Sequence, residues 1–166
     1  MNGTLFLVST PIGNYDDITL RALNVLKEVD LVVCEERKEG NRLLSHYKIE
    51  KQLVQLNEHN ETAAASIVLD ELQNGKNVAL ISDCGTPLFS DPGTILVRKA
   101  IQSKIKVTAI PGSSSLLPAL ITFGFDIKQF FSLNFTKMIS IFFYNVRVSI
   151  FRALEDDRPI LGPAIT

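Results

Sequence analysis

Cysteine and histidine are scarce in this sequence, and neither is spaced as a metal site requires. The 166 residues include two cysteines, Cys34 and Cys84, and two histidines. There is no CxxC pair and no cysteine and histidine cluster at metal-ligand spacing. We therefore expect no metal site and no disulfide. Both thiols are expected to be reduced and to lie in or near the core.

Signatures of several common α/β enzymes are also missing. There is no GxGxxG after the first apolar run and no GxxxxGK[ST] anywhere in the chain. The sequence therefore disfavours a dinucleotide dehydrogenase and a P-loop nucleotidase. It also lacks the GxSxG pattern of a nucleophile elbow.

The chain lacks both a strong net charge and a long apolar stretch. Its net charge is −1, so an RNA partner would need a local basic patch or a surface outside this chain. The apolar stretch at 139–151 includes Arg147 and is shorter than the roughly 20 residues that span a bilayer. The N-terminus has no basic flank before an apolar run, unlike a secretion signal. We expect a cytoplasmic protein without membrane contact.

Short apolar runs alternate with stretches of helical periodicity over residues 1–122. This alternation predicts an α/β domain with a five-stranded, mostly parallel sheet and flanking helices. The expected strands are 5–8, 31–34, 53–56, 78–81 and 106–110.

The helices are expected between these strands. The first should begin at a cap formed by Asp16 or Asp17 and continue to Val29. The others are expected around Leu43, Leu44 and Tyr47, at Glu61–Gln73, at Thr94–Ser103, and from Ser113 or Ser114 to Thr122.

Composition changes after this region. Eight of the ten phenylalanines lie at or beyond Phe123, and residues 130–151 are apolar without a clean period of two or 3.6. Residues 123–166 are therefore expected to form an atypical tail, separate from the domain at 1–122.

Three loops rich in glycine, proline, serine and aspartate follow the first, fourth and fifth expected strands. They are residues 9–14, 82–93 and 111–115. Ligands of open α/β sheets bind beyond the carboxyl ends of strands, so these loops are candidates for a binding site. Ordinary turns also use these residues, and for 10–14 alone that reading is equally good. The loop at 82–93 is long for a strand-to-helix connection, which favours a site there.

The motifs in these positions resemble a known superfamily. TPIGN at 10–14, CEER at 34–37, EHNE at 58–61, SDCGTPLFSDPG at 82–93 and PGSSS at 111–115 occur in order. Together they resemble the tetrapyrrole-methylase-like superfamily, most closely its ribosomal RNA small-subunit (cytidine-2′-O-)methyltransferase I branch. The resemblance covers roughly residues 3–131.

The resemblance implies a two-domain enzyme, usually a homodimer, that binds S-adenosyl-L-methionine between its domains. The implied reaction is methylation of a cytidine 2′-hydroxyl in small-subunit ribosomal RNA. Only the first domain is recognisable, so the tail would be a remnant of the connection to a missing second domain. The implied cofactor-binding residues are Thr10, Pro11, Gly13, Asp83, Gly85, Thr86, Pro87, Asp91, Pro92, Gly93, Pro111, Gly112, Ser113 and Ser114.

The segment after the second strand departs from the family, which commonly has Glu-Asp-Thr-Arg where this chain has residues 35–38. Glu35 and Glu36 are candidates for the general base that a ribose hydroxyl needs. For each alone, a solvated acidic turn or one paired with Arg37 is the slightly favoured alternative. Arg37, Lys38 and Arg42 could contact RNA phosphate or form a solvated helix start.

His59, Asn60 and Glu61 follow the third strand. A structural histidine and a helix cap are the favoured readings there.

Two other functions stay open. One is a tetrapyrrole methylase acting on a small molecule, which the TPIGN loop disfavours because that class has a glycine-rich first loop. The other is an inactive truncated remnant that at most binds the cofactor weakly.

Overall fold

A computed structural model of the chain describes residues 2–88, 91–115, 118 and 121–122. The chain divides into two compact units, residues 1–125 and 126–166, and every described residue belongs to the first. The expected tail at 123–166 lies outside the described residues, so the separation into a domain and a tail stays a prediction.

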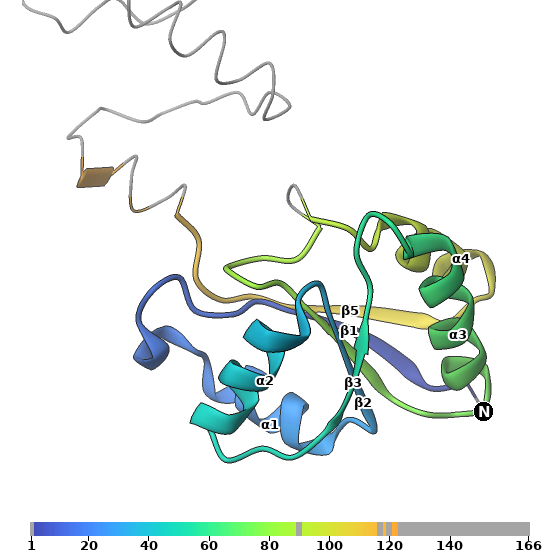
Figure 1. The fold of residues 1–166 in the computed structure, drawn as a ribbon, viewed down its shortest axis with the longest axis horizontal. Helices are drawn as coiled ribbons and strands as arrows, with labels where there is room; N and C mark the ends of the chain where they lie inside the picture. The colour runs from blue at the N-terminus through green and yellow to red at the C-terminus, as the bar shows by residue number, and fades with distance from the viewer. Residues whose placement is uncertain (1, 89–90, 116–117, 119–120, 123–166) are drawn as a thin grey trace, which may run out of the picture. The chain divides into compact units, whose positions relative to one another are not determined.

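The described part is built on a five-stranded sheet, as the sequence predicted (Figure 1). The strand order is β3-β2-β4-β1-β5, and all neighbouring strands run parallel. Because all strands point the same way, all loops that follow strands emerge at one edge of the sheet. The strands are β1 (Thr4–Val8), β2 (Leu31–Cys34), β3 (Gln52–Gln55), β4 (Val78–Ile81) and β5 (Lys106–Ile110).

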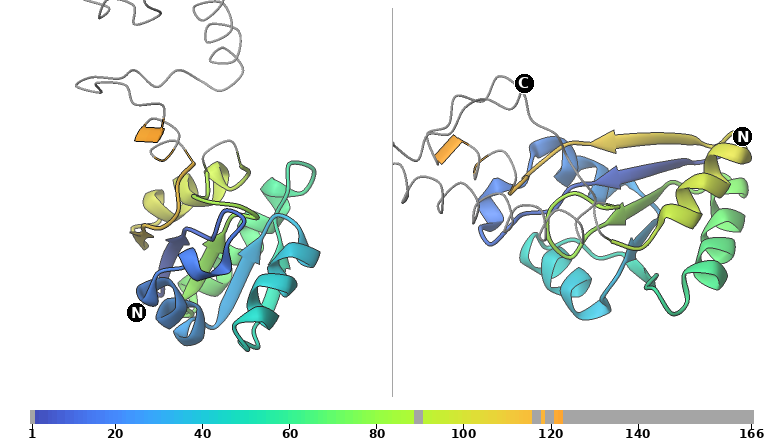
Figure 2. Two further views of the ribbon diagram at one scale, coloured as in Figure 1. Left: turned by 90° about the vertical axis from the view of Figure 1, so that its left-hand side faces the viewer. Right: turned by 90° about the horizontal axis from the view of Figure 1, so that it is seen from above.

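Helices cover both faces of the sheet (Figure 2). The first pair packs on one face and the second pair on the other, each pair with its own apolar cluster. The fold class predicted from the sequence is therefore confirmed. The helices are α1 (Leu20–Glu28), α2 (Arg37–His46), α3 (Glu61–Gln73) and α4 (Thr94–Gln102), and a 3₁₀ turn, η1, spans Tyr15–Asp17.

The central strands are uninterrupted apolar runs because helices cover them on both faces. All four residues of β2 are buried. Leu31 and Val33 belong to the cluster under α3 and α4, whereas Val32 and Cys34 belong to the cluster under α1 and α2. Burying one such side chain contributes about 1.5–3 kcal/mol. A parallel strand covered on both faces therefore has no polar positions.

The start of α1 differs from the expectation. Asp16 and Asp17 lie in η1, where the side chain of Asn14 accepts a hydrogen bond from the Asp16 amide at 3.1 Å. Thr19 caps α1 instead, because its hydroxyl accepts from the Ala22 amide at 3.1 Å. An acidic pair ahead of an apolar periodicity can close its own turn, and the helix then begins at the next capping residue.

Smaller differences occur elsewhere. Strand β3 lies one residue earlier than expected, and α2 is longer than the segment expected around Leu43. After β5, positions 118, 121 and 122 are helical. The predicted cap at Ser113 or Ser114 is not observed, because Ser115, which directly follows them, is not helical. The positions between Ser115 and Pro118 lie outside the described residues.

A network of backbone and side-chain bonds joins the segments at the amino ends of the strands. The Thr4 amide donates to Oδ1 of Asn77 at 2.9 Å, and the Asn77 amide donates to Oδ2 of Asp30 at 2.8 Å. The Asp30 amide donates to the Asn77 carbonyl at 2.9 Å. Lys51 donates to the Val29 carbonyl at 2.6 Å. These bonds fix the short turns at this end of the sheet. Thr4 is the first residue of β1, and Asp30 directly precedes β2.

One edge of the sheet is partly covered by a side chain. Strand β5 ends the strand order, and its Ile110 carbonyl accepts from the Ser9 amide after β1. The carbonyl of the preceding residue, Ala109, points the other way, because carbonyls alternate along a strand. Arg21 of α1 donates to it at 3.1 Å.

Of the helices in the described part of the chain, none has the length and apolar character needed to cross a membrane.

Candidate functional site

The loops after β1, β4 and β5 meet at the carboxyl edge of the sheet. The Thr10 amide donates to the Gly85 carbonyl at 2.8 Å, and the Ser9 amide donates to the Ile110 carbonyl at 3.1 Å. A Cβ atom at Gly112 would lie 2.9 Å from that of Ser9, so only glycine permits this approach. The convergence of the three loops that the sequence predicted is therefore observed.

Buried hydroxyl groups join the loops at their base. Ser9, Thr10 and Ser82 have exposed fractions of 3%, 1% and 4%. Oγ of Ser9 lies 3.2 Å from Oγ1 of Thr86, and the Thr10 hydroxyl donates to the Ser82 carbonyl at 3.0 Å. The hydroxyls replace water as partners, so the loop bases are held without a ligand.

The long loop between β4 and α4 is fixed at both ends. The Ser82 hydroxyl donates to Asp91 at 2.5 Å, which joins the first residues of the loop to its last residues. Beyond the loop, Oε1 of Glu61 accepts from the amides of Gly93 at 2.9 Å and Ile95 at 3.0 Å. Glu61 therefore caps the N-terminus of α4 from the first turn of α3. A carboxylate there is favoured by the helix dipole.

Asn60 and His59 precede α3, where we expected a cap and a structural histidine. Asn60 occupies the cap position, but its side chain makes no capping bond. It donates to the Gln55 carbonyl at 3.1 Å instead, and Oδ1 accepts from the Asn57 amide at 2.8 Å. His59 is exposed. In the EHNE segment, Asn60 therefore fixes the loop after β3, and Glu61 caps the N-terminus of α4.

Two pockets flank the loop after β1. The larger has a volume of about 530 Å³ and lies between this loop, η1 and the loop after β5. The smaller, about 170 Å³, lies between this loop, α2 and the loop after β4. The larger is lined by Ile12, Asp17, Gly112, Ser113, Ser114, Ser115 and Pro118, the smaller by Pro11, Gly13, Tyr15, Glu39, Arg42, Leu43, Asp83 and Cys84.

The residues expected to bind the cofactor differ in how much of them is accessible. Five are buried, so they shape the loops: Thr10, Pro11, Gly85, Pro87 and Gly93. Nine are partly or fully exposed at the same edge: Gly13, Asp83, Thr86, Asp91, Pro92, Pro111, Gly112, Ser113 and Ser114.

Sequence reasoning did not assign to the site several residues that line the pockets from outside the three loops. Tyr15 and Glu39 line the smaller pocket, and Asp17 lines the larger one. Asp17 was expected only as a helix cap, whereas its carbonyl accepts from the Ser113 hydroxyl at 3.3 Å. The one sequence signal that could have placed Tyr15 and Asp17 in the site is that they directly follow the TPIGN loop.

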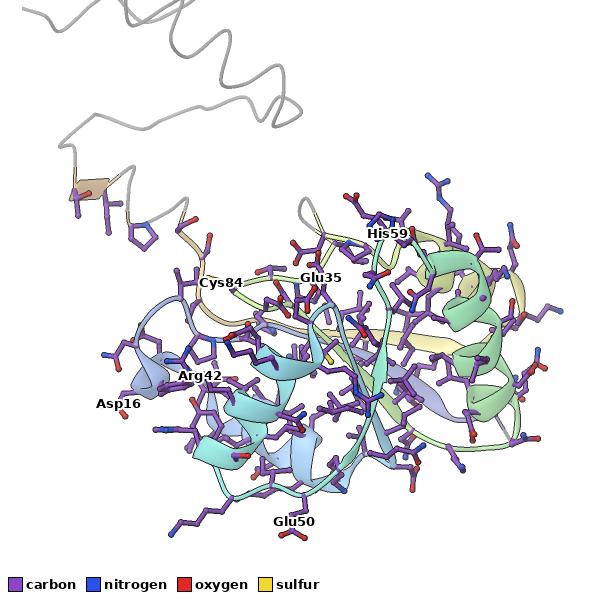
Figure 3. All side chains as sticks on the ribbon, viewed as in Figure 1. Asp16, Glu35, Arg42, Glu50, His59 and Cys84 are labelled. Atoms are coloured by element: carbon purple, nitrogen blue, oxygen red, sulfur yellow. The ribbon has the colours of Figure 1, made fainter. Side chains whose placement is uncertain are left out.

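Carboxylates gather where β2 and β4 end (Figure 3). The Glu36 amide donates to Oδ1 of Asp83 at 3.3 Å. Burial, followed by the negative charges of Asp83, Asp91 and nearby glutamates, raises the pKa of Glu35. Burial also raises the pKa of Asp83, against the lowering effect of the Glu36 amide. Glu35 is half-buried, whereas Glu36 is exposed, so of these two glutamates Glu35 lies in the environment better suited to a base.

The basic residues of α2 do not form one surface. Lys38 and Arg42 are four residues apart and share a helix face, whereas Arg37 faces away from Arg42. Arg42 lies 3.6 Å from Glu39 in an ion pair and lines the smaller pocket with it. With Asp83 also there, this pocket is acidic in balance, which disfavours a phosphate inside it.

The two cysteines are both free, as expected, but their environments differ. Cys34 is fully buried, and desolvation is the largest cause that raises its pKa to about 11. Cys84 is exposed, so the expectation of a thiol in or near the core is wrong for it. Within the described part of the chain, no group of histidine, cysteine and acidic residues could hold a metal ion.

Comparison with protein families matches residues 4–139 to Tetrapyrrole (Corrin/Porphyrin) Methylases. The chain belongs to this family. The match extends beyond residue 131, where we expected the resemblance to end.

Curated members of this methylase family are similar over most of the chain. A protein of Pseudomonas aeruginosa is 50% identical over 128 residues, which are 77% of this chain and 45% of that protein. One of Haemophilus influenzae is 38% identical over 178 aligned positions, 98% of this chain and 63% of that protein. Both are named ribosomal RNA small subunit methyltransferase I. The chain thus spans about half to two thirds of the length of these relatives.

Two solved structures share the fold of this chain. Uroporphyrin-III-C-methyltransferase from Thermus thermophilus is 22% identical with a TM-score of 0.60, over 78% of this chain and 56% of that one. A conserved hypothetical protein from Aeropyrum pernix K1 is 18% identical with a TM-score of 0.64, over 79% and 46%. At these identities the likeness establishes the fold alone.

Proposed function

We propose that these residues provide the cofactor-binding half of an S-adenosyl-L-methionine-dependent methyltransferase. Its proposed substrate is a cytidine 2′-hydroxyl in small-subunit ribosomal RNA. With this substrate the enzyme would act in the cytoplasm. We also propose that it acts as a homodimer, as the family resemblance implies. The observation that carries the proposal is the convergence of three pre-organised loops beside a pocket of about 530 Å³. The names of relatives 38–50% identical support small-subunit ribosomal RNA as the substrate, and the resemblance of the sequence motifs supports the cytidine 2′-hydroxyl.

The residues at this edge fit the cofactor. The volume lies within the roughly 300–1,000 Å³ of small-molecule sites. Accessible hydroxyls at Thr86 and Ser114 and the exposed backbone of Gly112 offer partners for adenosine and amino-acid groups. When bound, S-adenosyl-L-methionine supplies an electrophilic methyl group. The buried glycines and prolines hold these partners in place, which lowers the entropic cost of binding.

Glu35 is the better candidate for the general base than Glu36. Removal of a proton from a ribose hydroxyl is helped by a carboxylate whose pKa is raised above its ordinary value. Burial and the neighbouring carboxylates do this for Glu35. Arg37, Lys38 and Arg42 stay candidates for RNA contacts. Their side chains are exposed, and α2, on which they lie, begins at the same edge of the sheet.

The proposal is tested by titrating the purified 166-residue chain with S-adenosyl-L-methionine in a calorimeter. We expect measurable but weak binding, because the domain offers one wall of a site that the family closes between two domains. Absence of binding up to millimolar ligand would instead favour an inactive remnant.

Methyl transfer is tested on isolated small ribosomal subunits with labelled cofactor. The Pseudomonas aeruginosa relative serves as the full-length control. The 166-residue chain should be at least about a hundredfold slower, because one wall cannot hold the hydroxyl in line with the methyl group. A matching rate would show that this chain needs no further domain. Transfer to a porphyrinogen instead of RNA would favour the tetrapyrrole methylase alternative.

A further inference from the structure

Thr10 is buried at the point where the loops after β1 and β4 meet. Its side chain is 1% exposed. Its amide donates to the Gly85 carbonyl at 2.8 Å, and its hydroxyl oxygen accepts from the Gly85 amide at 3.1 Å. Thr10 therefore holds both backbone groups of Gly85.

The Thr10 hydroxyl has no proton left for a ligand. Its single proton points to the Ser82 carbonyl at 3.0 Å, with the Gly85 carbonyl at 3.4 Å as the poorer alternative. One hydroxyl thus contacts the first residue of the loop after β4 and the glycine three residues later. Because its hydroxyl proton is already bonded and its side chain is buried, Thr10 cannot contact a small molecule directly.

Gly85 is the residue whose conformation most needs such support. Its φ is +85°, a value that side chains rarely adopt, and glycine loses more backbone entropy than other residues when it is fixed. The peptide units on either side of Gly85 determine where the exposed Thr86 points. Oγ1 of Thr86 lies 3.2 Å from Oγ of Ser9, the neighbour of Thr10. The loop after β1 thereby sets the direction of the exposed part of the loop after β4.

We propose that Thr10 is a positioning residue of the cofactor site, acting on S-adenosyl-L-methionine only through the Gly85–Thr86 backbone that its hydroxyl holds. This rests on the proposed function and changes the role expected for Thr10, which was direct contact with the cofactor. It also accounts for the first residue of TPIGN, because the threonine supplies the hydroxyl that joins the two loops.

The test compares two substitutions with a matched control. Thr10→Val keeps the shape of the side chain and removes the hydroxyl, whereas Thr10→Ser keeps the hydroxyl. Thr19→Val makes the same change at the cap of α1, where the lost bond to the Ala22 amide lies outside the three loops. All three are made in the full 166-residue chain. Each is measured for melting temperature and for S-adenosyl-L-methionine affinity by calorimetry.

We expect Thr10→Val to weaken cofactor binding by about tenfold, because two buried backbone groups lose their partner. Thr10→Ser should stay within about threefold of the unmodified chain. Thr19→Val should lower the melting temperature, as loss of a helix cap does, and leave the affinity unchanged. Equal affinity of Thr10→Val and the unmodified chain would overturn the inference.

Hydrogen exchange of the Gly85 and Thr86 amides, measured without cofactor, separates positioning from contact. In Thr10→Val the exchange should be faster by about tenfold, and in Thr19→Val it should be unchanged. Lost affinity with unchanged exchange would overturn the inference in favour of direct contact. If the unmodified chain binds no cofactor at all, the proposed function fails and the inference fails with it. Normal binding in both the unmodified chain and Thr10→Val refutes the inference alone.

Discussion

The two ends of the sheet use the same kinds of bonds for different purposes. At the amino ends, Asn77 joins the segments before β1 and β2 through short exposed turns. At the carboxyl ends, Ser9, Thr10 and Ser82 make comparable bonds while they are buried. Above them lie exposed groups such as Thr86 and two pockets.

The difference shows what distinguishes a binding edge from a connecting edge in this domain. At the amino ends the bonds of Asn77 to Thr4 and Asp30 are themselves exposed at the surface. At the carboxyl ends the bonds of Ser9, Thr10 and Ser82 are buried beneath the surface. They hold in place groups such as Thr86 that stay exposed. Substitutions at the two ends should therefore separate stability from binding.

The largest expected effect is at Thr86. Thr86→Arg puts bulk and a positive charge into the proposed site, and it should weaken S-adenosyl-L-methionine binding at least about a hundredfold. Its melting temperature should fall only slightly, since Thr86 is exposed and the buried Ser9 loses one hydroxyl partner. Thr62→Arg, on the exposed surface of α3, is the control and should bind normally. Unchanged calorimetric affinity in Thr86→Arg would remove the loop after β4 from the site.

The two cysteines sharpen the comparison within the carboxyl end. Cys84 is exposed at the smaller pocket, whereas Cys34 is buried and its pKa is about 11. At pH 8 we expect Cys84 to react with iodoacetamide at least about a hundredfold faster than Cys34, because the thiolate is the nucleophile. Mass spectrometry of tryptic peptides gives both rates, and Cys84→Ser provides a protein with Cys34 alone. Similar rates would mean that β2 is open to solvent at this edge.

At the amino ends, Asn77→Ala should reduce stability without affecting binding. The substitution leaves the Thr4 amide to water, and we expect a loss of about 1 kcal/mol in the free energy of unfolding. Urea denaturation measures the loss, and S-adenosyl-L-methionine affinity should be unaltered. Asn74→Ala, also exposed and near the end of α3, is the control with little expected change. Weaker cofactor binding in Asn77→Ala would contradict the separation of the two ends.

The smallest effect concerns Glu35 and pH. Burial and neighbouring carboxylates raise its pKa above the unfolded-state value, so the folded state binds this proton more tightly. Ionisation of Glu35 therefore costs stability as pH rises from its unfolded pKa through its folded pKa. Glu35→Gln should increase stability at pH 7, by less than about 1 kcal/mol because solvent screens the group.

At about pH 3, Glu35→Gln and the unmodified chain should be equally stable, since the carboxyl is then protonated in both states. The control is Glu36→Gln, whose side chain is exposed at the same turn. Thermal melts across this pH range provide the comparison. A stability gain from Glu35→Gln that is the same at both pH values would rule out the electrostatic cause.

The sheet could be predicted from sequence because its signal is uninterrupted. Runs such as Leu31–Cys34 can only be covered strands, and the loops after strands then share an edge by geometry. The start of α1 could not be predicted in the same way. Asp17 and Thr19 are both good caps, and Asp17 is drawn instead into η1, where its carbonyl meets Ser113 from the other end of the domain.

The sequence predicted which residues belong to the candidate site. It did not predict which of them are buried supports and which are exposed to a ligand. The resemblance to the family implied the same cofactor-binding role for Thr10 and Thr86, and both are small polar residues in loops after strands. Their difference depends on burial, which arises from the close approach of Gly112 to Ser9 and from the position of Gly85. Such contacts join residues more than seventy positions apart, as in the bond from Thr10 to Gly85, and no local pattern contains them.

Arg21 has a bearing on how this protein avoids unwanted association. An edge strand presents unpaired carbonyls and amides that another chain can use to continue the sheet into an aggregate. On β5, the outward carbonyl of Ala109 already accepts from the Arg21 guanidinium. An incoming strand would have to displace a charged side chain to pair there. At the described edge of the sheet, the Ala109 carbonyl is therefore already paired and less available to another strand.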